Sequence, residues 1–422
     1  MPANPSETAP RPAQPPLAPK APRRAARLVR WAVLAVVLAA TTALGILHQK
    51  AGVGKPVGVD ALCPFGGLET LWSLVSTGTL LRRVALSSVL LLGAAVATAL
   101  VFRRTFCGRI CPLGFLQELA GRVGRRVFRR RLELPASFDK PARLLKYVVL
   151  AVSLLAAWQT AELAIRPYDP WVAYQHLTSA EVLAEFGVGL AVLALSLVGS
   201  FFYDRFFCKY ACPMGAFLAL ISRFSLVKVR RNASTCIDCK ACDRACPANV
   251  SVSTVDVVTS PECIDCGECV AACPVADTLA QGTKTRRLSP VAASVLSVAL
   301  FATLVGGATA AGAFEWTMPT LKEEIERSRG SGATAPAPGA FDTSLIRGST
   351  TISEIVEAVG IPAKEFTRVY GVPVSEQDRP LKELKDTYGC YPGDVRTFVD
   401  LYLTDPAAAA TYVPGTATEE GH

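Results

Sequence analysis

Five long apolar runs constrain the fold of this chain more than any other feature of its sequence. A helix needs about 20 apolar residues, with a range of about 17–25, to cross the hydrocarbon core of a bilayer. Four runs meet this length, and the third meets it only when it is continued to Ile165. We therefore expect an all-α polytopic membrane protein with about five transmembrane helices. The runs are Trp31–Leu47, Val84–Phe102, Tyr147–Ala161, Phe186–Tyr203 and Val291–Phe314.

Two alternatives to five membrane helices stay open from the sequence. The first apolar run is short and follows a basic segment, which is also typical of a signal peptide. A sixth helix would require Ala61–Leu81 to cross the membrane. That stretch contains Cys63, Pro64, three glycines and Glu69, so we interpret it as a re-entrant or interfacial segment.

The distribution of charge predicts the orientation of the helices. Residues 103–146 carry 12 Lys or Arg and 3 Asp or Glu, and residues 203–287 carry 11 and 8. Residues 166–185 carry one Arg, whereas the chain after Phe314 carries 10 basic and 17 acidic residues. Because positively charged loops stay in the cytoplasm, we expect a multi-pass protein of the inner (cytoplasmic) membrane. Its N-terminus and both basic loops would face the cytoplasm, and its C-terminal domain would be extracytoplasmic.

Composition excludes two broad classes of protein. Hydrophobic residues make up 51% of the chain and charged residues 19%, against roughly 25% charged residues in an ordinary soluble domain. With a mean hydropathy of +0.33, neither an intrinsically disordered protein nor a plain cytosolic enzyme is expected. The net charge of +9 does not indicate a nucleic-acid partner, because the basic residues flank the apolar runs.

Eight of the fourteen cysteines form two runs of the kind that bind iron–sulfur clusters. Each run has the spacing C-x2-C-x2-C-x3-C-P of bacterial two-cluster ferredoxins. Structural zinc sites, the alternative, more often use paired C-x2-C knuckles than four-cysteine runs closed by Cys-Pro. The runs begin at Cys236 and Cys263 and end at Pro247 and Pro274.

The spacing also predicts which cysteines share a cluster. The first three cysteines of a run reach one cluster from a single loop, and the fourth reaches the other cluster. We therefore expect two [4Fe-4S] clusters in an inserted α+β 2[4Fe-4S] ferredoxin domain. The first would be bound by Cys236, Cys239, Cys242 and Cys273. The second would be bound by Cys246, Cys263, Cys266 and Cys269.

An internal repeat supplies four further cysteines. Residues 104–114 (RTFCGRICPLG) align with residues 205–215 (RFFCKYACPMG), and each copy follows an apolar run. Two half-units related as parallel repeats would bring both C-x3-C-P turns to the same membrane face. The soft thiol ligands would suit a further metal centre or a redox-active thiol set, although Cys-Pro-x-Gly can also be a simple helix-ending turn. The four candidates are Cys107, Cys111, Cys208 and Cys212.

The paired C-x3-C-P turns together with the double-cluster insert make the chain resemble the polytopic membrane 4Fe-4S ferredoxins. That family includes the quinol-dehydrogenase membrane component of periplasmic nitrate reductase, the nitrous-oxide-reductase accessory protein and the cytochrome-oxidase assembly ferredoxins. The resemblance covers roughly residues 28–314 and includes the segment Leu-Cys63-Pro-Phe-Gly-Gly-Leu-Glu69. It implies a function in membrane electron transfer.

Residues that handle quinol or form a disulfide are less strongly indicated. His48, His176 and Glu162 are predicted at the outer interface, where an acid or a histidine can accept protons; ordinary interfacial residues are the competing interpretation. Cys63 and Cys390 are both predicted outside, where an oxidising compartment would permit a disulfide, but the sequence does not establish one.

The domain organisation follows from these segments. After a disordered tail (1–26) we expect a four-helix membrane domain with the two repeats (27–228). The ferredoxin domain (229–287), a fifth transmembrane helix (288–314) and a linker (315–340) would follow. A small helical extracytoplasmic domain (341–422) would end the chain, beginning near the capping-box pattern at Thr351 and Glu354.

These features favour electron transfer over other functions. Electrons would pass between a quinol or a cytoplasmic donor and an unidentified partner redox protein. The alternative is an assembly or regulatory factor that supplies electrons for maturation of a metalloenzyme. A transporter is disfavoured because the apolar runs carry almost no charge. No nucleotide-binding glycine loop or catalytic triad pattern is visible, so no group chemistry of its own is expected.

Overall fold

The structure is a computed structural model, and it divides into two compact units. It describes residues 20–50, 56, 62–77, 86–129, 134–160, 165–179, 182–317, 321, 341, 343–346, 348 and 350–414. The first unit comprises Met1–Ile46 and Gly58–Glu315, and the second comprises Leu47–Val57 and Trp316–His422. Glu162 and most of the expected linker lie outside the described residues.

Four helices of the described chain are long and apolar enough to cross a membrane. The segments that meet both criteria are Arg23–Gln49, Ser137–Gln159, Glu185–Phe202 and Pro290–Ala310. They correspond to α1 (Lys20–Lys50), α5 (Ala136–Ala142) with α6 (Leu145–Thr160), α8 (Val182–Phe202) and α13 (Pro290–Ala310).

Two helix boundaries differ from those expected from the sequence. The run at Val84–Phe102 forms α3 (Leu86–Phe102), which at 17 residues is a shorter apolar helix than the other four. Helix α1 begins at Lys20, inside the segment expected to be disordered, because the Ala- and Arg-rich residues before Trp31 are good helix formers.

Short helices fill the first unit between the long ones. Helix α2 (Pro64–Thr77) has 14 residues and packs against α3 and α6. Helix α7 (Pro170–Gln175) packs against α8. Helices α4 (Pro112–Phe128) and α8 also pack closely. A Cβ on Gly124 would lie 1.7 Å from the backbone oxygen of Phe201, so this contact requires glycine.

The two repeats fold as the same chain path, a helix followed by a cysteine turn and a second helix. In the first copy α3 leads into the π-helical turn Phe106–Ile110 and then α4. In the second, α8 leads into α9 (Phe206–Tyr210) and then α10 (Pro213–Ile221). The second cysteine of each turn, Cys111 or Cys212, is extended and caps the next helix, whose first residue is proline.

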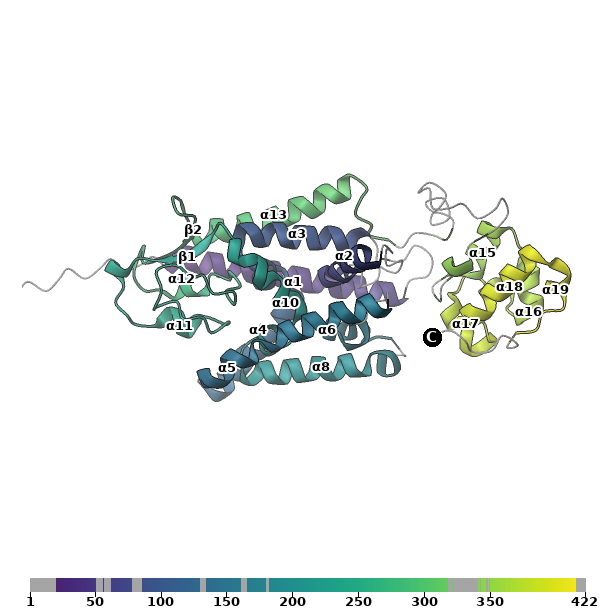
Figure 1. The fold of residues 1–422 in the computed structure, drawn as a ribbon, viewed down its shortest axis with the longest axis horizontal. Helices are drawn as coiled ribbons and strands as arrows, with labels where there is room; N and C mark the ends of the chain where they lie inside the picture. The colour runs from purple at the N-terminus through teal and green to yellow at the C-terminus, as the bar shows by residue number, and fades with distance from the viewer. Residues whose placement is uncertain are drawn as a thin grey trace, which may run out of the picture. The chain divides into compact units, whose positions relative to one another are not determined.

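The insert between α10 and α13 combines a small sheet with two short helices. The antiparallel sheet has the order β1 (Lys228–Arg231), β2 (Leu279–Gly282) and β3 (Arg287–Leu288). Helices α11 (Ala241–Ala245) and α12 (Glu268–Ala272) pack against each other. Figure 1 shows these elements gathered at one end of the long helices, with α2 toward the other end.

The second unit is helical and has a core of its own. Its helices are α15 (Ile352–Val359), α16 (Ala363–Tyr370), α17 (Leu381–Tyr388), α18 (Pro392–Thr404) and α19 (Pro406–Ala410). The capping box between Thr351 and Glu354 is present. Phe398 is fully buried and contacts the rings of Phe366 and Tyr370. Cys390 lies buried in this core and Cys63 belongs to the first unit, so the Cys63–Cys390 pairing stays a prediction.

Candidate metal centres

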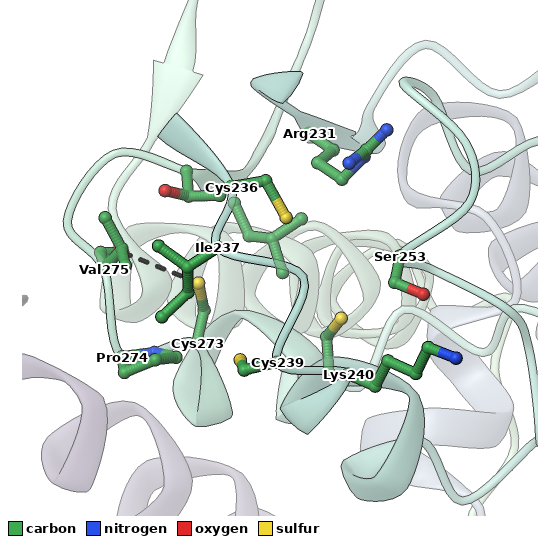
Figure 2. A pocket seen from close by; sticks show the side chains of 12 residues that line it. Arg231, Cys236, Ile237, Cys239, Lys240, Ser253, Cys273, Pro274 and Val275 are labelled. Atoms are coloured by element: carbon green, nitrogen blue, oxygen red, sulfur yellow. Dashed lines mark hydrogen bonds between the residues drawn. The ribbon is translucent and has the colours of Figure 1, made fainter. Parts of the chain in front are cut away.

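Four cysteines of the insert surround one pocket. Cys236, Cys239, Cys242 and Cys273 line it together with the apolar side chains of Ile237, Pro274, Val275 and Leu279. Figure 2 shows Cys236 and Cys239 reaching the pocket from one loop and Cys273 from another segment. These are the four residues that the ferredoxin spacing assigns to a single cluster.

Two loops of the insert share one backbone shape. Asp238 and Lys240 have positive φ values of 48° and 54°, and Asp265 and Gly267 have values of 53° and 75°. The left-handed region is uncommon outside glycine, although aspartate enters it more readily than most residues. The repeated left-handed pair turns each C-x2-C loop so that successive cysteines face the same side.

The second ferredoxin set lies beside the first. Cys246 and Cys269 belong to a buried cluster that also contains Cys242 and Cys273, Cys263 packs against this cluster, and Cys266 packs against a neighbouring one. Burial raises the pKa of the Cys269 thiol well above its usual range, and the charges of Cys266, Cys246 and Cys263 raise it further. Thiolates raise one another's pKa only when they lie close together. Metal cations bind thiolates, so cysteines placed in this way suit a shared metal centre.

The four cysteines of the C-x3-C-P turns converge as well. Burial raises the pKa of Cys111 to about 12, with further increases from the charges of Cys208 and Cys107. Burial likewise raises the pKa of Cys212, and the charges of Cys208, Cys107 and Cys111 add to that rise. The two turns are far apart in sequence, but the fold places their thiols within reach of one another's charge.

Arginines that the sequence analysis did not select surround these thiols. Burial would lower the pKa of Arg104, but the charges of Cys107 and Glu262 outweigh it and leave the pKa raised. The buried Nε atoms of Arg104 and Arg205 have no hydrogen-bond partner among the described residues. A thiolate-bound iron–sulfur cluster is negatively charged and would supply acceptors there, so the residues present fit such a group.

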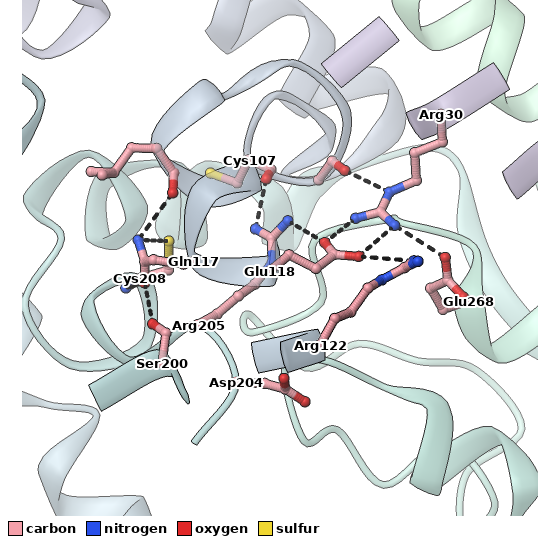
Figure 3. Close-up of polar contacts among 12 residues, drawn as sticks. Arg30, Cys107, Gln117, Glu118, Arg122, Ser200, Asp204, Arg205, Cys208 and Glu268 are labelled. Carbon is pink, nitrogen blue, oxygen red and sulfur yellow. Dashed lines mark hydrogen bonds and ion pairs between the residues drawn. The ribbon is translucent and has the colours of Figure 1, made fainter. Parts of the chain in front are cut away.

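Helix α4 supplies two further residues to the same site. Gln117 donates from Nε2 to Sγ of Cys208 at 3.3 Å, and its Oε1 accepts from the Cys208 backbone N–H. Burial would raise the pKa of Glu118, but the charges of Arg30 and Arg205 lower it to about 2. Figure 3 shows this network beside Cys107.

A buried arginine directly before the first apolar run joins the turn to the insert. Arg30 is 1% exposed. Its Nε donates to the Gly108 carbonyl at 2.8 Å, and its Nη1 donates at 3.0 Å to both Glu118 and Glu268 (Figure 3). The signal in the sequence was an arginine at the start of an apolar run, where a buried charge requires partners.

Among the described residues, no group of three or more His, Cys, Asp or Glu side chains is placed to hold a single metal ion.

The two histidines considered for quinol each contact a backbone oxygen nearby in the sequence. His48 shares a 2.8 Å hydrogen bond with the backbone oxygen of Pro56. The His176 ring makes the same kind of contact with Val172 and packs against Phe186. Cys63 packs beside the same core as Cys107 in the first unit.

Comparison with known protein families identifies the two cysteine-bearing parts. The family described as "4Fe-4S binding domain" matches residues 84–134 and 186–232, which contain the two C-x3-C-P turns. The family described as "4Fe-4S dicluster domain" matches residues 228–274. The chain is also 32% identical over 285 residues to YccM of Escherichia coli, a match that covers 65% of this chain and 79% of YccM. The chain belongs to the membrane ferredoxin-type 4Fe-4S family that includes YccM.

Other members match a smaller share of the chain. The ferredoxin-type protein NapH of Escherichia coli is 32% identical over 177 residues, which cover 41% of this chain and 57% of NapH. The regulatory protein NosR of Stutzerimonas stutzeri is 30% identical over 152 residues, or 34% of this chain and 20% of NosR. No solved structure matches the chain significantly. Both family descriptions that match this chain name 4Fe-4S clusters.

Proposed function

We propose that this chain is a membrane-bound iron–sulfur protein that transfers electrons between a quinol or a cytoplasmic donor and a partner redox protein. The observation that carries the proposal is the pocket lined by Cys236, Cys239, Cys242 and Cys273 in a chain that matches two 4Fe-4S domain families. Membership of a family that includes YccM, whose name assigns it to electron transport, supports the same function.

Each cysteine set would hold one centre. Cys236, Cys239, Cys242 and Cys273 would bind the first [4Fe-4S] cluster, and Cys246, Cys263, Cys266 and Cys269 would bind the second. Cys107, Cys111, Cys208 and Cys212 would bind a further iron–sulfur centre. When bound, these groups supply one-electron redox chemistry.

The surrounding residues prepare the sites for negatively charged centres. Burial raises the pKa of Cys111 and Cys212, and a bound metal would favour their thiolate forms. Arg104 and Arg205 are nearly inaccessible to solvent and place fixed positive charge beside the turns. The positive charge of these two arginines offsets part of the negative charge of four thiolates, so the site depends less on mobile counterions.

The membrane arrangement forms part of the proposal. We infer that α3 is a fifth membrane helix beside the four long ones, and that the cysteine turns and the ferredoxin insert face the cytoplasm. The supporting observation is the excess of Lys and Arg in residues 103–146 and 203–287. The segment 341–422 would then form an extracytoplasmic domain.

A second candidate function is the supply of electrons for assembly or regulation of a metalloenzyme. The likeness to NosR, whose name describes a regulatory protein, favours it. The two functions differ in what depends on the chain. In the first, electron flow to a partner stops when the chain is absent. In the second, the metal content of a partner enzyme falls.

The test measures cluster reduction in membranes that contain the full chain. Addition of a reduced quinol analogue should produce the electron paramagnetic resonance signals of reduced clusters, and extraction of quinone should abolish reduction by endogenous donors. A variant with all four C-x3-C-P cysteines changed to serine should lose part of the iron and the corresponding signal. Unchanged reduction after quinone extraction would favour a cytoplasmic donor, and clusters that no donor reduces would contradict electron transfer.

A further inference from the structure

The two equivalent loops of the ferredoxin insert have opposite surroundings. Ile237, between the first two cysteines of the first loop, is 53% exposed, and Cys239 is also exposed. Ile264 stands at the same position of the second loop and is 4% exposed. Because the two loops share their backbone shape, the difference comes from what covers the second loop.

The first C-x3-C-P turn covers the second loop by direct backbone contact. A Cβ on Gly108 would lie 2.1 Å from the backbone oxygen of Ile264 and 3.5 Å from the backbone nitrogen of Cys266. Only glycine permits this approach without a backbone shift. We call Cys107, Cys111, Cys208 and Cys212 the membrane set. Gly108 follows Cys107 directly, so it lies between one cysteine of the membrane set and the cysteine loop of the insert.

Charged side chains fix this contact from both sides. Arg109 donates to Asp265 at 3.2 Å, and also to the Ala293 carbonyl and the Ser297 hydroxyl of α13. Arg30 binds the Gly108 carbonyl and Glu268 at the same time. Asp265 and Glu268 both lie within the Cys263–Cys269 segment; Asp265 is buried and Glu268 is partly buried.

The second turn reaches the same ligand set. Lys209, which lies directly after Cys208, donates to Asn249 at 3.2 Å. Asn249 follows Cys246, the fourth cysteine of the second set, and its backbone N–H donates to the Cys246 carbonyl. By contrast, Asp238 of the first loop pairs with Arg231 of β1, inside the insert itself.

From these contacts we propose that the second set (Cys246, Cys263, Cys266 and Cys269) relays electrons between the first set and the membrane set. Gly108 and Arg30 form the junction between the second set and the membrane set. The inference rests on the proposed function. Each transfer moves one electron, oxidising one centre and reducing its neighbour by one electron. No bond is made or broken, and no proton is required.

The test uses purified full-length protein in detergent, with a reduced soluble ferredoxin as the one-electron donor. Such a donor can approach the first set at the exposed Cys239, whereas Cys107 is buried and Cys111, Cys208 and Cys212 are partly buried. In the wild type, rapid freezing and electron paramagnetic resonance should show all centres becoming reduced. Cys263→Ser should retain reduction of the first set and lose reduction of the membrane set.

Two pairs of variants isolate the junction from the ligands. Gly108→Ala should keep the wild-type iron content but lose rapid reduction of the membrane set, whereas Gly93→Ala, with no atom within 4 Å of the added Cβ, should behave as the wild type. Arg30→Lys should act like Gly108→Ala. Its control is Arg27→Lys, because Arg27 also pairs with Glu268 but is partly exposed.

Three results overturn the proposal, and they separate its failure from that of the proposed function. If Gly108→Ala and Arg30→Lys, with full iron content, reduce the membrane set as fast as their controls, the junction is wrong and the proposed function stands. The same holds if the membrane set is still reduced in Cys263→Ser. If replacing Cys107, Cys111, Cys208 and Cys212 by serine leaves the iron content and spectra unchanged, the chain has no membrane centre. That result contradicts this part of the proposed function and the relay as well.

Discussion

The guanidinium of Arg205 occupies the space beside Gly114 where a side chain would otherwise project. A Cβ on Gly114 would lie 3.0 Å from Nη1 of Arg205. The relationship is reciprocal, because a Cβ on Gly215 would lie 2.7 Å from Nη2 of Arg104. Arg104 of the first repeat therefore lies against Gly215 of the second, and Arg205 of the second lies against Gly114 of the first. This exchange explains why Arg and Gly recur at the same places in both copies.

We predict that Gly215→Ala destabilises the membrane centre. The added methyl group would push Arg104 away from its contacts with Pro261 and Glu262, at a cost of about 1–3 kcal/mol for overpacking. The cluster absorbance should bleach at a lower temperature than in the wild type. Gly93→Ala serves as the control, and an equal bleaching temperature in both variants would contradict the prediction.

Glu118→Gln should be strongly destabilising. Glu118 pairs with the buried Arg30 and Arg205, and loss of one partner from a buried ion pair costs about 3–5 kcal/mol. Asp256→Asn is the matched control, because Asp256 pairs with Arg231 while largely exposed, and such pairs contribute about 0–1 kcal/mol. Thermal unfolding of both variants measures the difference, and similar shifts would be against the prediction.

The contribution of Glu118 should also depend on pH in a defined direction. Its pKa is about 2 in the folded chain, against an ordinary value of 4.5. A carboxyl group with a lowered folded pKa stabilises the protein fully above its ordinary pKa, and this stabilisation is lost as the pH falls toward the folded value. The stability difference between wild type and Glu118→Gln should be constant above about pH 5.5 and shrink below about pH 4.5. A difference that grows on acidification would refute this assignment.

The ferredoxin insert should bind about eight iron atoms in two clusters. Cys239→Ser should remove the resonance signal of one cluster and leave most of the other, because Cys239 lines the pocket of a single set. Iron analysis after anaerobic purification checks the count. Zinc in place of iron would overturn the prediction.

Reporter fusions test the proposed orientation. A reporter that is active only outside the cytoplasm should work when fused after Gly339 and fail when fused after Lys284, since the basic loops are expected inside. Activity at both positions, or the reverse pattern, would contradict the five-helix arrangement and the cytoplasmic location of the clusters.

Phe398→Ala should unfold the second unit selectively. Phe398 is fully buried and contacts four aromatic rings, and loss of such a side chain costs about 3–5 kcal/mol. Limited proteolysis of the full-length protein should cleave residues 341–414 faster, while the cluster absorbance is unchanged. Thr397→Ala, at the exposed neighbouring position, should be cleaved as slowly as the wild type.

Local spacing predicted the cluster-binding character of the chain, but the contacts around the cysteines required the fold. The regular C-x2-C-x2-C-x3-C-P runs and the apolar lengths carry their information within a few residues, so the 4Fe-4S family and the membrane helices were evident. Arg30 is far in sequence from the C-x3-C-P turns, and Glu118 lies on the helix after Cys111, but their pairing arises only through tertiary packing. Gly108 looked like an ordinary turn residue, because nothing in its own segment shows that Ile264 lies against it.

The reciprocal exchange of arginines also sets the order in which the protein can be completed. The residues around Cys107 and Cys111 include Arg205, which is synthesised only after α8. Until then the first cysteine pair lacks the partners that the second repeat supplies. Iron delivery to the proposed membrane centre would thus be a late event in biogenesis, and a truncated chain that ends before α9 would lack Cys208 and Cys212.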